Sequence, residues 1–138
     1  LERYRRNASG AGASAVHTVQ DDFFQSLSAH FGTPELRGQQ FDIVVCDPPA
    51  LIQARSDLER GKPQYKRAFA FAHSLVRPGG FLILSSCSQL LDRDGFDELL
   101  PRGLRVWQGQ QSTDHPVPDF FPEAAYLKCV ILRIPPKP

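Results

Sequence analysis

The strongest constraint in this sequence is a pattern of two apolar stretches separated by a segment long enough for a helix. The stretches at 41–46 and 81–85 have the nearly continuous apolar character of strands covered on both faces. The segment at 63–76 carries apolar residues at helical spacing, and Pro-Gly-Gly at 78–80 is expected to stop that helix. Two buried strands joined by a helix form a parallel crossover, so the pattern predicts an α/β sheet.

Polar residues follow each of these strands. Asp-Pro-Pro stands at 47–49 and Ser-Cys-Ser at 86–88. The carboxyl ends of neighbouring parallel strands meet at one edge of the sheet, which is where open α/β sheets bind ligands. We therefore expect Asp47 and Cys87 to face one crevice.

The remaining pattern predicts one domain. Hydrophobic residues make up 41% of 138 residues, enough for a single core, and no stretch is long and apolar enough to span a membrane. The last two expected strands, at 104–108 and 126–134, are not separated by a helix and should pair antiparallel. Further elements are expected as a strand at 15–20 and helices at 23–31 and 92–100.

The cysteines and the charge distribution indicate the cellular compartment and the type of partner. The cysteines at 46, 87 and 129 show no metal-ligand spacing and no even disulfide set, which favours a reducing compartment and predicts a cytoplasmic protein without a metal. Net charge is +1, yet residues 51–80 carry six basic and two acidic side chains. This segment, including Lys66 and Arg67, is either a surface for a phosphate backbone or a solvated helix face.

Four stretches resemble class I S-adenosylmethionine-dependent methyltransferases, in particular the bacterial 23S rRNA 5-methylcytosine methyltransferases that carry a PUA domain. They are Asp-Asp-Phe-Phe at 21–24, Cys-Asp-Pro-Pro at 46–49, Pro-Gly-Gly through Ser-Cys-Ser at 78–88, and Thr-Asp-His-Pro through Tyr-Leu-Lys at 113–128. The resemblance implies a partial Rossmann-like sheet, mostly parallel with an antiparallel C-terminal hairpin.

The resemblance also implies which part of such a domain this is. Residues 1–134 would be the C-terminal portion of the catalytic domain, covering its strands three to seven, and 135–138 a tail. The Gly-rich cofactor loop of the family is not found in this sequence. The expected spatial order of the strands is 41–46, 81–85, 126–134 and 104–108, with the strand at 15–20 not paired to 41–46.

By the same resemblance, S-adenosylmethionine is the cofactor and RNA, in particular ribosomal RNA, the partner. Asp22, Phe23 and Asp47 would contact the cofactor, although Asp22 also suits a helix N-cap. Asp47 would in addition hold the base. A plain turn is the alternative reading of Asp47.

Cys87 would be the catalytic nucleophile, because C5 of cytosine accepts a methyl group only after a thiolate has added to C6. The alternative is a small buried hydrophobe, which is the role expected of Cys46 and Cys129. Asp114 and His115 form either a loop anchor or an acid/base pair. The side chains expected at the substrate are Pro48, Pro49, Ser86, Ser88, Lys66 and Arg67.

Two other functions stay open. Amino-group methylation of guanine or adenine also uses an Asp-Pro-Pro turn, but usually with an aromatic residue after the prolines, where this chain has Ala50 and Leu51. The other is a non-catalytic remnant that binds RNA or a partner. A homodimer is the further assembly that the sequence leaves open.

Overall fold

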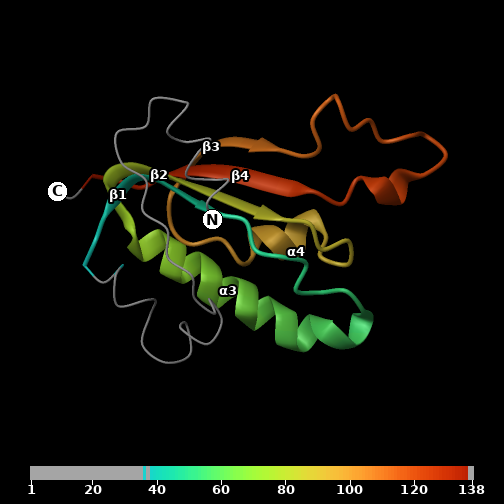
Figure 1. Cartoon of the computed structure of the whole chain (residues 1–138), viewed down its shortest axis with the longest axis horizontal. Helices are drawn as coiled ribbons and strands as arrows, with labels where there is room; N and C mark the ends of the chain where they lie inside the picture. The colour runs from blue at the N-terminus through green and yellow to red at the C-terminus, as the bar shows by residue number, and fades with distance from the viewer. Residues whose placement is uncertain (1–35, 37, 137–138) are drawn as a thin grey trace, which may run out of the picture.

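The computed structural model describes residues 36 and 38–136, which form a four-stranded mixed sheet with helices on one face (Figure 1). Within the described residues, a strand is followed by a long crossover helix and a second strand, and the last two strands are joined by a long loop. In chain order the elements are β1 (Phe41–Cys46), the 3-10 turn η2 (Arg55–Asp57), α3 (Leu58–Ser74), β2 (Val76–Ser86), α4 (Arg93–Asp97), β3 (Leu104–Gly109), the 3-10 turn η3 (Pro122–Ala124) and β4 (Lys128–Arg133).

The order of these strands in the sheet is β1-β2-β4-β3, as predicted from the sequence. β1 and β2 are parallel, and β4 pairs antiparallel with both β2 and β3. Three of the four strands therefore run in one direction, and β4 alone runs against them. The predicted strand at 15–20, the helix at 23–31 and the residues Asp22 and Phe23 lie outside the described residues.

The Pro-Gly-Gly sequence does not end the helix, which is a correction to the prediction. α3 already ends at Ser74, and 78–80 lie inside β2. There the pairing jumps from Phe41 with Val76 to Ile43 with Phe81, so the segment bulges out of the ladder. Gly79 has a φ of 82°, and a Cβ on Gly80 would lie 2.7 Å from the Asp42 carbonyl oxygen. Glycine is required at both positions.

α3 begins five residues earlier than predicted. Its N-cap is Asp57, whose carboxylate accepts the backbone N–H groups of Gln53 and Ala54 at 3.3 and 2.9 Å. Those bonds order the preceding loop. Pro63 is tolerated inside the helix. α4 is shorter than the predicted 92–100, and Asp92 is its N-cap, accepting the Gly95 N–H at 2.8 Å.

The core lies between the sheet and the two helices. Figure 1 shows α3 along one face, and Phe96 of α4 packs edge-on against Phe69 of α3, with ring centroids 5.7 Å apart. The largest apolar side chains buried there are Tyr65, Phe69, Phe96, Ile52, Leu82, Leu84, Leu91 and Val130. In the part of the chain that the structure describes, no helix is both long and apolar enough to cross a membrane.

The opposite face of the sheet is exposed along β1 and is half-buried in its middle strands, within the residues that the structure describes. Side chains alternate along β1, so Cys46 faces the core while Ile43 and Val45, at 59% and 63% exposure, face the other way. The expectation that this strand is covered on both faces is therefore wrong for residues 38–136.

Candidate active site at the carboxyl edge of the sheet

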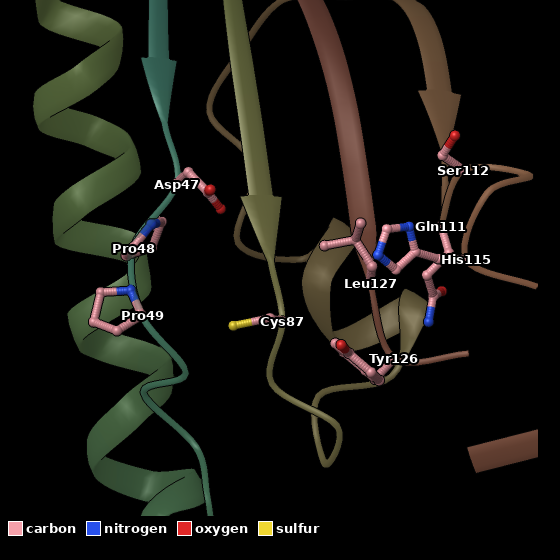
Figure 2. A pocket seen from close by; sticks show the side chains of 9 residues that line it. All are labelled: Asp47, Pro48, Pro49, Cys87, Gln111, Ser112, His115, Tyr126 and Leu127. Atoms are coloured by element: carbon pink, nitrogen blue, oxygen red, sulfur yellow. The ribbon is translucent and has the colours of Figure 1, made fainter. Parts of the chain in front are cut away.

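A pocket of about 660 Å³ opens where β1 and β2 end, within the size range of small-molecule sites (Figure 2). It unites two regions singled out in the sequence, the segments after β1 and β2 and the loop between β3 and β4. Its lining residues are Asp47, Pro48, Pro49, Cys87, Gln111, Ser112, His115, Tyr126 and Leu127. The crossover thus brings Asp47 and Cys87 to one crevice, as predicted.

Asp47 is held by a neighbour that the sequence analysis did not single out. The Ser85 hydroxyl donates a short hydrogen bond to Oδ1 of Asp47. Cys46 pairs with Leu84 in the parallel ladder, so the next residue on each strand lies side by side. The register of β1 against β2 is therefore the feature that places Ser85 beside Asp47. The other carboxylate oxygen has no hydrogen-bond partner among the described contacts, so it is available to a ligand.

Cys87 is the thiol that lines the pocket. It is half-buried, and Figure 2 shows its sulfur pointing from the end of β2 toward Pro48 and Pro49. Partial exposure at a strand end suits a reactive cysteine.

The other two cysteines have different surroundings. Burial and, secondarily, the Asp47 carboxylate raise the pKa of Cys46 from 9.0 to about 11. Burial also raises the pKa of Cys129. Neither group lines the pocket. Cys46 is buried in the core, as predicted, whereas Cys129 is only half-buried, so the buried role predicted for it does not hold.

Ser86 and Ser88 lie on the core side of the chain. Both are fully buried, and their hydroxyls bond the Tyr65 hydroxyl at 2.9 and 2.8 Å. Because side chains alternate along an extended chain, Ser85 and Cys87 lie on the side away from the core, where Ser85 bonds Asp47 and Cys87 lines the pocket, while Ser86 and Ser88 face the core. Contact of these two serines with a substrate, expected from the sequence, is not supported by this arrangement.

Lys66 and Arg67 are exposed on α3 and do not line the pocket. Neither pairs with a carboxylate in the described part of the molecule, unlike Arg60, which pairs with Asp57, and Lys62, which pairs with Glu98. Their positive charge is therefore available to an outside partner.

The far wall of the pocket comes from the loop between β3 and β4. His115 contacts Asp114 there, with Nδ1 and Oδ1 3.2 Å apart. A hydrogen bond from Ser112 and then the one from His115 lower the pKa of Asp114. Both side chains are mostly exposed. Within the described residues, no group of three His, Cys, Asp or Glu side chains is placed to hold a metal ion.

Solved structures of the same fold share this architecture. The structure of SMU.776, described as a methyltransferase and solved with SAH, aligns with a TM-score of 0.66 and 15% identity over 97% of this chain and 37% of that one. TrmN from Thermus thermophilus aligns with a TM-score of 0.56 and 18% identity over 94% of this chain and 32% of that one. The chain has the α/β fold of class I S-adenosylmethionine-dependent methyltransferases.

Curated relatives are more similar in sequence. Ribosomal RNA large subunit methyltransferase I of Yersinia pseudotuberculosis serotype O:1b (strain IP 31758) is 34% identical over 129 residues, which cover 88% of this chain and 32% of that protein. The protein of the same name from Yersinia pestis is 33% identical over the same share. The chain thus spans about a third of the length of these relatives. No protein-family model matches it.

Proposed function

We propose that this chain is the C-terminal part of an S-adenosylmethionine-dependent RNA methyltransferase that methylates C5 of a cytosine in 23S rRNA. The observation that carries the proposal is the convergence of Asp47 and Cys87 on one pocket at the carboxyl edge of the sheet. The similarity to ribosomal RNA large subunit methyltransferases supports RNA as the substrate.

The residues present fit the cofactor and a base. The pocket combines proline walls with one carboxylate whose free oxygen can accept an amino N–H, from either the adenine or the cytosine. Asp22 and Phe23 would complete the cofactor site. When bound, S-adenosylmethionine supplies the methyl group.

Cys87 provides the activation that cytosine needs. Its thiolate forms a bond to C6, which makes C5 electron-rich enough to take the methyl group. After methylation the C5 proton leaves to a base, the electron pair of that C–H bond restores the C5=C6 double bond, and the C6–S bond breaks to return the thiolate. Asp47, fixed by Ser85, would hold the amino edge of the base during these steps.

The basic residues would contact the phosphate backbone. Arg55, Lys66 and Arg67 are exposed and have no carboxylate partner among the described residues. They lie on the crossover that follows the Asp-Pro-Pro segment, on η2 and α3. Lysine and arginine without internal partners can replace the counterions of RNA, which gives salt-dependent binding.

The decisive experiment uses the full-length parent enzyme and RNA that contains 5-fluorocytosine at the target. Fluorine at C5 blocks the last step, so the wild type should stay linked to the RNA, and mass spectrometry should find the link on Cys87. Cys87→Ser should lower turnover by several orders of magnitude without unfolding the protein. Cys129→Ser, the matched control on β4, should still form the link.

Two results would overturn this assignment. Linkage through another cysteine, or near-normal turnover by Cys87→Ser, would make amino-group methylation around Asp47 the better reading. Failure of the full-length protein to bind S-adenosylmethionine would favour a non-catalytic module.

A further inference from the structure

The hydroxyl of Tyr65 lies where α3 meets both segments that line the pocket. Tyr65 is fully buried. Its oxygen bonds Ser86 Oγ at 2.9 Å and Ser88 Oγ at 2.8 Å on one side, and the Pro49 carbonyl at 3.3 Å and the Leu51 N–H at 3.4 Å on the other. A phenol donates one hydrogen bond and accepts about two, so these neighbours saturate it.

Ser88 makes a second connection between the same segments. Its hydroxyl accepts the Ile52 N–H at 3.1 Å, and Ile52 is only 1% exposed. From the opposite side, Nζ of the buried Lys128 on β4 donates to the Ser88 carbonyl at 2.7 Å. The residue that follows Cys87 is therefore held by a loop, a helix and a strand.

Close packing at Gly61 also holds the loop at 51–52 against α3. A Cβ there would lie 2.4 Å from the Ile52 side chain and 2.7 Å from the Leu51 carbonyl oxygen, so only glycine lets α3 approach the loop this closely. The segment after Asp-Pro-Pro is thus pressed against the helix that carries Tyr65.

We propose that Tyr65, with Ser86 and Ser88, is a positioning residue that sets the distance between the Asp47 carboxylate and the Cys87 thiol. Ser85 bonds Asp47 and Cys87 lines the pocket, while Ser86 and Ser88, which alternate with them, bond Tyr65. A buried network of this kind is costly to leave half-satisfied, so it specifies one arrangement. This inference rests on the proposed function, because it assumes that Asp47 and Cys87 act on the same base.

The test is Tyr65→Phe in the full-length enzyme, which removes only the hydroxyl. A misplacement of about 1 Å can cost on the order of 100-fold in rate, so we expect linkage to 5-fluorocytosine RNA in a single turnover to slow by about 10- to 100-fold. Kd for S-adenosylmethionine and RNA should change less than about threefold. The matched control is Ser74→Ala, which removes the 2.7 Å bond from Ser74 Oγ to the Phe71 carbonyl on the same helix and should leave the rate unchanged.

A second pair of variants tests the inference independently, in case Tyr65→Phe misfolds. Ser88→Thr keeps a hydroxyl and should retain more of the linkage rate than Ser88→Ala. Linkage rates within twofold of wild type for both Tyr65→Phe and Ser88→Ala would overturn the inference, as would equal losses in Ser88→Thr and Ser88→Ala.

Alkylation separates this inference from the proposed function. In Tyr65→Phe, iodoacetamide should modify Cys87 severalfold faster than in the wild type, with no change at Cys129, as followed by mass spectrometry without RNA. If the wild type never links to RNA, the proposed function fails while this alkylation result still decides whether Tyr65 holds the loop. Unchanged alkylation of Cys87 would then overturn the inference.

Discussion

The two walls of the pocket are held in different ways. The near wall, from Asp47 to Pro49 and at Cys87, is backed by hydrogen bonds to the buried side chain of Tyr65. The far wall belongs to a loop that includes Phe120, which is 91% exposed, and His115, whose side chain is 79% exposed. The residues assigned to the chemistry lie on the wall that the core holds, whereas the far wall has the exposure of a surface that can adapt to a substrate.

Among these variants, Asp47→Asn on the near wall is expected to change turnover the most. The amide keeps the shape and can still bond Ser85, but it lacks the charge, and a hydrogen bond to a charged group contributes about 1.5–3 kcal/mol. We expect turnover of the full-length enzyme to fall about 10- to 100-fold. A loss confined to KM for S-adenosylmethionine would assign the carboxylate to the cofactor, and a loss in kcat to the base.

The control is Asp42→Asn on the same strand, which removes only the exposed pair with Arg77. That variant should retain wild-type turnover. Equal activity of Asp47→Asn and Asp42→Asn would mean that the near wall has no chemical role.

High pH should lower the free energy of unfolding through Cys46, which packs in the core next to the near wall. The pKa of Cys46 is raised from 9.0 to about 11 in the folded protein, so between these values the unfolded chain releases a proton that the folded chain keeps. The contribution is fully present below pH 9 and is lost as pH rises through 11, a decrease of about 2–3 kcal/mol in the free energy of unfolding.

Urea unfolding of the wild type and Cys46→Ala at pH 8 and at pH 10.5 measures this difference. Other groups titrate in both proteins, so only the excess loss in the wild type is assigned to Cys46. Parallel losses in the two proteins would contradict the prediction.

The smallest change in the free energy of unfolding is expected in the loop that carries the far wall. Phe120→Ala should change the free energy of unfolding by less than about 0.5 kcal/mol, because an exposed ring loses little packing. Phe69→Ala, in the core, should cost about 3–5 kcal/mol. Thermal unfolding of both variants compares the loop that carries the far wall with the core behind the near wall, and a loss above 1 kcal/mol for Phe120→Ala would show that this loop is packed.

Local pattern was sufficient for much of the fold. The strand Phe41–Cys46 has its predicted bounds, and the strand order β1-β2-β4-β3 agrees with the order implied by the family resemblance. Pro-Gly-Gly at 78–80 misled the prediction because the same residues suit a helix stop and a strand bulge. Which one forms depends on pairing with β1, a contact distant in sequence.

The sequence by itself determined that a carboxylate and a thiol follow two neighbouring parallel strands, because the crossover has only one favoured geometry. Only the tertiary structure decided the direction of each serine at 85–88. In an extended chain, alternate side chains face opposite sides, and the side that becomes the core is the one that α3 covers. Ser85 therefore bonds Asp47, while Ser86 and Ser88 bond Tyr65, more than 20 residues away along the chain.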